Sequence, residues 1–180
     1  TIAALVIGYL SFTQISIENF PAWTGTTLSF IAAGSYLGFL FWNWYPQKIM
    51  PGYGGKSLAG YLLATIALLN TAKFGTAILV LGIPTIDAVY VLVTRLISRH
   101  NPTQAGRSHL HHKLLDAGWG KRRIALFYWI VSGILGLVAL TVNPKQKFFT
   151  VGLVALIFIM LITWLKLSTI FLRKSDQDNG

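Results

Sequence analysis

The run IALFYWIVSGILGLVALTV, residues 124–142, has no charged side chain and directly follows the basic residues Lys121, Arg122 and Arg123. As a helix, a run of this length rises roughly 28 Å, close to the ~30 Å hydrocarbon core of a bilayer. A soluble protein of this size rarely leaves so long a run without a polar side that can face water. We therefore expect residues 124–142 to form a transmembrane helix.

Similar apolar runs recur along the chain and predict further spans. They lie at residues 1–12, 26–44, 58–71, 74–96 and 148–172. The run from Thr1 to Phe12 is too short to cross a bilayer, so we expect a helix whose beginning is missing. Pro84 should kink the run at 74–96. The prediction is an all-α polytopic transmembrane helix bundle of about six spans, the first one truncated, over residues 1–172.

Composition supports a lipid environment. The 180 residues are 54% hydrophobic and 11% charged, with a mean hydropathy of +0.60, which leaves few polar groups to cover a water-exposed surface. The formal charge of +10 would suggest nucleic acid in a soluble protein, but here we expect the bilayer as partner and no nucleic acid. The absence of cysteine excludes a disulfide framework and a thiolate metal site.

Lys and Arg concentrate between alternate apolar runs, at residues 43–57 and 95–123 and after residue 172. Short cytoplasmic loops retain such residues. We therefore expect a multi-pass plasma-membrane protein with the loop at 95–123 and the C-terminus in the cytoplasm. The polar tail at 173–180 should be disordered.

Three histidines gather in the basic loop, in RSHLHHKLL at residues 107–115. His109 and His112 could ligate zinc from one helical face, but two nitrogens need further ligands. Alternatively, the segment is an interfacial helix with its leucines in the headgroup region. Finally, His109, His111, His112 and Arg107 could bind a phosphate or diphosphate, because imidazole and guanidinium groups offer several hydrogen-bond donors.

Two further features could belong to such a site. Asp87, in GIPTID at residues 82–87, is the only acidic residue within a predicted span, where a carboxylate is costly and usually functional. It could pair with Arg95 or with helix backbone, or it could orient a His or Lys of the active face. The loop PGYGGKS at residues 51–57 is either a flexible turn carrying Lys56 or a phosphate-binding loop, and it lacks the P-loop spacing.

Three segments in order, NWYPQKI (43–49), GIPTID (82–87) and RSHLHHKLL (107–115), resemble motifs of the polyprenyl-phosphate N-acetylhexosamine-1-phosphate transferases, the glycosyltransferase 4 family of the MraY and WecA types. The resemblance implies transfer of a sugar 1-phosphate from a UDP-activated amino sugar to polyprenyl phosphate, releasing UMP, with Mg²⁺ as cofactor. It implies these site residues: catalytic His109, His111 and His112, and substrate-binding Arg107, Asn43, Lys56 and Asp87.

The chain also departs from the family pattern. Tyr53 stands where the family's Gly-Asp-x-Gly-Ser loop has a magnesium carboxylate, and a phenol is a poor ligand for a hard cation. The family's upstream Asp-rich motifs would lie before Thr1. We therefore expect the C-terminal portion of a longer enzyme, inactive by itself and without metal ligands of its own, whose Mg²⁺ binds only in the complete protein.

Two other functions compete with the transferase. A non-catalytic homologue would bind polyprenyl phosphate or a partner protein, as Tyr53 and Lys56 in place of metal-site residues suggest. A transporter fragment would need further polar residues inside several spans, and only Asp87 fits that description. In any of these roles the chain could form a homodimer.

Overall fold

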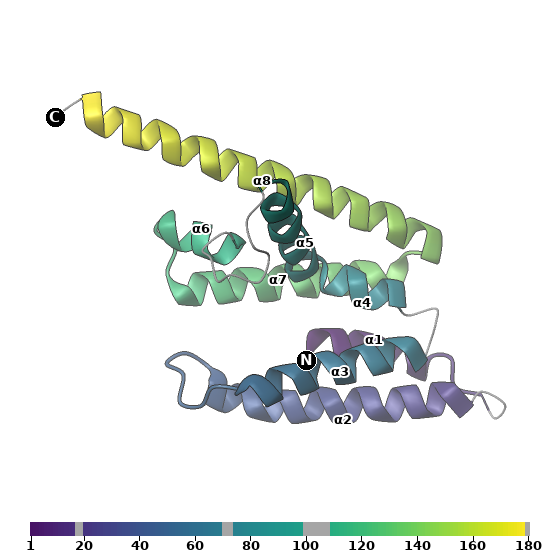
Figure 1. Ribbon diagram of the computed structural model, residues 1–180. Coiled ribbons are helices and arrows are strands. Elements are labelled where there is room, and N and C mark those ends of the chain that lie inside the picture. The colour runs from purple at the N-terminus through teal and green to yellow at the C-terminus, as the bar shows by residue number, and fades with distance from the viewer. Residues whose placement is uncertain (17–19, 70–73, 99–108, 179–180) are drawn as a thin grey trace. The chain divides into compact units, whose positions relative to one another are not determined.

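The computed structural model describes residues 1–16, 20–69, 74–98 and 109–178, and all regular structure in these ranges is helical (Figure 1). The predicted all-α class is confirmed. The helices are α1 (Ile2–Phe12), α2 (Phe20–Asn43), α3 (Tyr53–Leu69), α4 (Phe74–Val80), α5 (Gly82–Ile97), α6 (Leu110–Asp116), α7 (Lys121–Thr141) and α8 (Pro144–Asp178). They form two compact units: Thr1–Leu81 with Ser132–Phe149 is unit 1, and Gly82–Val131 with Thr150–Gly180 is unit 2.

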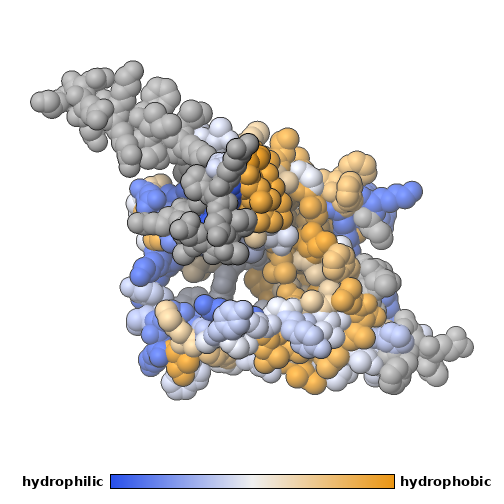
Figure 2. Space-filling model, viewed as in Figure 1, coloured by the Kyte–Doolittle hydropathy of each residue, from blue (hydrophilic) through white to orange (hydrophobic). Residues whose placement is uncertain are grey.

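Several helices are long and apolar enough to cross a bilayer. Among the described residues these are Pro21–Asn43, Lys121–Thr141 and Lys145–Trp164, and the broken pair α4 and α5 can make a fourth span. Large apolar side chains stay exposed on them, such as Phe41 at 80%, and Figure 2 shows apolar residues over much of the visible face. Such a surface fits lipid and not water. The chain is thus a membrane protein.

The number of spans differs from the expected six. In the described ranges three helices, or four with the broken pair, meet the requirements for a span. α1 has 11 residues and α3 has 17. At 1.5 Å per residue, both rise less than the ~30 Å of a hydrocarbon core. The apolar runs were identified correctly, but these two helices are shorter than a span.

The expected kink at Pro84 is a complete break one turn earlier. α4 ends at Val80 and α5 begins at Gly82. In a continuous helix the Pro84 ring would clash with the carbonyl of Val80, and its missing N–H would leave that carbonyl without a partner. In the first turn of a new helix neither penalty arises. Starting α5 at Gly82 therefore accommodates the proline.

Two segments expected to be irregular are helical. Tyr53 to Lys56, predicted as part of a loop, is the first turn of α3, and the Lys56 N–H donates to the carbonyl of Gly52 at 3.2 Å. The tail predicted to be disordered continues α8 as far as Asp178. Residues 173–178 contain neither Pro nor Gly, so no residue there stops a helix that has already formed.

Unit 1 is built on small residues. α1 packs against α2, α3 and α4, around a core of Ile7 and Ile66 with three alanines, Ala32, Ala67 and Ala77. A Cβ at Gly8 would lie 3.0 Å from Cβ of Ser29, and one at Gly136 would lie 3.0 Å from Cγ2 of Val6. Glycine at these points allows the close helix approach that is common in bilayers.

Unit 2 places α6 in a protein core. Leu110 and Leu114 of α6 are buried with four residues of its other helices, Ile83, Ile124, Phe158 and Ile162. Tyr90 of α5 meets Phe158 of α8 edge to face, with ring centroids 6.2 Å apart. The interfacial interpretation, with the leucines in the headgroup region, is wrong for Leu110 and Leu114, because the protein itself covers them.

We predict that Gly136→Leu destabilises unit 1 and that Gly133→Leu, one turn away on α7, does not. A Cβ at Gly133 meets nothing within 4 Å, whereas the larger side chain at Gly136 must displace Val6. Overpacking of this kind costs on the order of 1–3 kcal/mol. Thermal unfolding of both variants in the same detergent measures the difference. Equal melting temperatures would contradict the close packing at Gly136.

Candidate functional site

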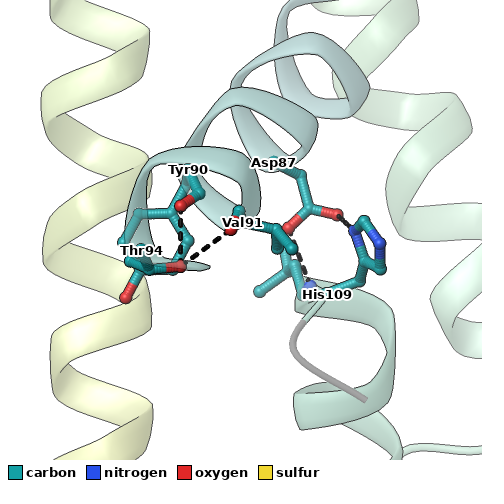
Figure 3. Close-up of polar contacts among 6 residues, drawn as sticks. Asp87, Tyr90, Val91, Thr94 and His109 are labelled. Atoms are coloured by element: carbon teal, nitrogen blue, oxygen red, sulfur yellow. Dashed lines mark hydrogen bonds and ion pairs between the residues drawn. The ribbon is translucent and has the colours of Figure 1, made fainter. Parts of the chain in front are cut away.

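Asp87 and His109 are in direct contact. The Oδ2 atom of Asp87, on α5, lies 2.9 Å from Nδ1 of His109, and Oδ1 accepts a hydrogen bond from the backbone N–H of Leu110 at 2.9 Å (Figure 3). The side chain of Asp87 is 7% exposed and that of His109 is 36% exposed. This is the geometry expected of a carboxylate that orients a histidine.

The local sequence explains how the histidines reach Asp87. His109 has an extended backbone and is the N-cap residue of α6, but its own side chain makes no capping hydrogen bond. The first N–H groups of a helix need acceptors, and Asp87 supplies one to Leu110 from another helix. At the other end, Gly118 adopts φ +84°, which favours glycine and ends α6 after 7 residues.

The three imidazoles are neighbours. The rings of His111 and His112 have centroids 4.2 Å apart, and those of His109 and His111 are stacked at 5.7 Å. Among the described residues, Nδ1 of His112 is a buried side-chain nitrogen without a hydrogen-bond partner. The cluster therefore holds a buried polar atom that no described group of the protein satisfies.

Burial lowers the pKa of His111 below the usual 6.5, and the neighbouring His112 and His109 lower it further, while Asp87 raises it. Imidazolium ions in contact repel one another, so the cluster resists carrying three charges at once. At neutral pH His111 is therefore mostly neutral, and it can act as a single N–H donor.

Asn43 and Lys56 lie in unit 1, whereas Asp87 and the histidines lie in unit 2. The Nδ2 group of Asn43 donates to the carbonyl of Ile49 at 2.9 Å and so folds the connection between α2 and α3 back on itself. Lys56 is exposed in the first turn of α3. Arg107, the remaining predicted site residue, lies outside the described residues, and the substrate-binding roles stay predictions.

The described residues do not fit a metal ion. Within these ranges no group of three or more His, Asp or Glu side chains could hold one, so the zinc interpretation of the histidines finds no ligand set. Both oxygens of Asp87 are already hydrogen-bonded, one to His109 and the other to the backbone N–H of Leu110. Tyr53, at the position of the family carboxylate, is 90% exposed and offers only a phenol. The Mg²⁺ that the resemblance implies finds no such group among the described side chains, and its binding in the complete protein stays a prediction.

The described chain is thus an all-α membrane protein in which a carboxylate of one helix holds a cluster of imidazoles at the start of another. Residues 1–71 match the family described as Glycosyl transferase family 4. The resemblance drawn from the motifs is confirmed, and over these residues the chain is similar to this family.

Three curated relatives extend this finding. The chain is 29% identical over 141 residues to the "Probable undecaprenyl-phosphate N-acetylglucosaminyl 1-phosphate transferase" of Bacillus subtilis, covering 75% of this chain and 39% of the relative. It is 28% identical over 162 residues to the "Decaprenyl-phosphate N-acetylglucosaminephosphotransferase" of Mycolicibacterium smegmatis, covering 78% and 39%. It is 30% identical over 109 residues to the "Phospho-N-acetylmuramoyl-pentapeptide-transferase" of Borrelia turicatae, covering 60% and 31%.

The chain spans less than two fifths of the length of these relatives. The family match ends at residue 71, before the histidines. The match to the Mycolicibacterium smegmatis relative covers 78% of the chain. The match therefore extends well past residue 71, into the part of the chain that carries Asp87 and the histidines. No solved structure matches the chain.

We predict that anion binding at the histidines takes up a proton. An anion stabilises imidazolium, so it should raise the lowered pKa of His111. Affinity for sulfate, an anion whose charge is constant over this range, should rise as the pH falls from 8 to 6, by at most about tenfold per pH unit for each proton. Calorimetry in two buffers of different ionisation enthalpy counts the protons. His111→Gln should reduce the count, and an unchanged count would contradict the assignment to His111.

Proposed function

We propose that this chain carries the histidine-bearing part of an enzyme that transfers an N-acetylhexosamine 1-phosphate from a UDP-sugar to polyprenyl phosphate, releasing UMP, in cell-envelope precursor synthesis. The observation that carries the proposal is the contact between Asp87 and His109, which fixes a cluster of imidazole side chains at the start of α6. The printed names of the relatives supply the class of substrates.

The chemistry asks for groups that offset negative charge. A phosphate oxygen of the lipid attacks the β-phosphorus of the UDP-sugar, a new P–O bond forms, and the bond from that phosphorus to the bridging oxygen breaks as UMP leaves. Negative charge spreads over the phosphoryl oxygens during the transfer. Imidazole N–H groups aimed at those oxygens stabilise the transition state more than the ground state. His111 and His112 supply such donors, and His109 does so from Nε2 when its ring is protonated.

The environment of the segment suits both substrates. The exposed apolar side chains of the spans can contact the polyprenyl chain in hydrocarbon, while the UDP-sugar stays in water. We assign the histidine segment to the cytoplasmic face, since Arg and Lys are concentrated between residues 95 and 123. No step is assigned to Mg²⁺ here, because the described residues hold no group of three or more His, Asp or Glu side chains that could bind it.

A second function, a non-catalytic homologue that binds the same lipid phosphate, rests on a separate observation. Tyr53 is 90% exposed at the position where the family pattern has a carboxylate, and the described residues hold no group that could bind a metal ion. Such a protein would bind UDP-sugar or polyprenyl phosphate at the histidines without turnover.

The test is transfer of radiolabelled sugar phosphate from UDP-N-acetylglucosamine to undecaprenyl phosphate by the full-length protein with Mg²⁺ in the buffer. His109→Ala should lower kcat on the order of 10²-fold or more, as removal of a transition-state hydrogen-bond donor does. Asp116→Asn changes an exposed acid of the same helix and should leave kcat unchanged.

The second function predicts a different set of results. The wild-type protein would bind the UDP-sugar but show no transfer, and Tyr53→Asp would not restore turnover. Absence of both transfer and binding would overturn both functions and leave only the membrane architecture.

A further inference from the structure

We infer that Asp87 is a positioning residue: it fixes His109 as the Nδ1–H tautomer and holds the start of α6, so that Nε2 of His109 is the atom presented to substrate. The inference rests on the proposed function for the identity of that substrate. It removes Asp87 itself from the set of groups that touch substrate, where the sequence had placed it.

Both oxygens of the Asp87 carboxylate are occupied. Its two oxygens are each 2.9 Å from a nitrogen of the histidine segment, Nδ1 of His109 and the backbone N of Leu110. With a side chain only 7% exposed, Asp87 has little surface left for a ligand, whereas His109 is 36% exposed. Of this pair, only the imidazole can reach a substrate.

The ring hydrogen of neutral His109 lies on Nδ1. A carboxylate accepts hydrogen bonds, and the N–H of Leu110 already donates to Oδ1, so Nδ1–H of His109 is the donor to Oδ2. The hydrogen bond made by one ring nitrogen sets the state of the other. Nε2 therefore bears a lone pair in the neutral ring and an N–H after protonation. It can take a proton or donate a hydrogen bond to a phosphoryl oxygen.

Asp87 also supports the backbone at the start of α6. Leu110 is fully buried, so its N–H would have no acceptor without Asp87, and an unmatched buried donor costs about 1–3 kcal/mol. One side chain thus fixes both the ring and the helix that carries His111 and His112. This double contact explains why a carboxylate is kept within an apolar helix, where its burial is costly.

Asp87→Asn separates positioning from a purely structural role. The amide oxygen can still accept from Leu110, but the NH2 group then faces Nδ1 of His109 and donates to it, which selects the Nε2–H tautomer. The hydrogen bond from the Leu110 N–H is kept, while the tautomer of His109 is reversed. Nε2 then carries a hydrogen and can no longer take a proton. We therefore expect the melting temperature to stay near that of the wild type, kcat to fall on the order of 10²-fold, and KM to change little.

Nitrogen NMR of 15N-histidine-labelled full-length protein in detergent reads the tautomer directly, with His109→Gln to assign the signals. At pH 8 we expect Nδ1–H in the wild type and in the control Asp116→Asn, and Nε2–H in Asp87→Asn. The wild-type spectrum is a test in itself, so the inference stays falsifiable even if Asp87→Asn does not fold. Nε2–H in the wild type would overturn it, and so would an Asp87→Asn enzyme with wild-type kcat.

The two proposals can fail separately. If the wild-type protein shows no transfer but Asp87→Asn inverts the tautomer, the positioning by Asp87 is supported and only the proposed function fails. If transfer is present and lost in His109→Ala, while the tautomer and kcat do not respond to Asp87→Asn, the transferase is supported and the positioning role is overturned.

Discussion

The carboxylate of Asp87 is the interaction on which the histidine site depends. A carboxylate within an apolar helix costs about 3 kcal/mol on insertion scales, and a larger amount if it is left without partners. Here both oxygens are matched by donors from the start of α6. The same contact ties residues 109 and 110 to a helix more than twenty positions upstream. The placement of His111 and His112 follows, because they belong to the helix that begins at this point.

The spans could be predicted because their main constraint is local. The run at 124–142 lies almost wholly within α7, Lys121–Thr141, since the thickness of a bilayer sets a length that can be counted along the chain. The break at Leu81 depends on a choice between kinking a helix and starting another, and the presence of Pro84 alone does not decide it. The first turn of α3 was missed because Gly54 and Gly55 favour a loop locally, whereas the apolar run that follows favours a longer helix.

The site could be predicted in part. The contacts that were missed join residues far apart in the sequence. The residue types singled out Asp87 and the histidines, because a carboxylate in a span and three imidazoles in a basic loop are both unusual. Two leucines four positions apart, as at 110 and 114, look the same whether lipid or protein covers them. Only the packing against Ile83 and Phe158 shows that protein does. The bond from Leu110 N–H to Asp87 has no signal in the sequence, since any backbone could make it.

The charge balance of the cluster explains which chemistry it can offer. The histidines adjoin one carboxylate and one another, and burial and the two neighbouring histidines lower the pKa of His111, so an anion would stabilise the charged form of this ring. A metal ion would reverse this balance, but the described side chains offer no group of three ligands to bind it. What the described imidazoles themselves can offer is hydrogen bonding from their N–H groups. Such donors must be aimed in advance to stabilise a transition state, because reorienting them during the reaction would cost the energy they supply. A buried carboxylate that fixes ring and backbone together meets that requirement.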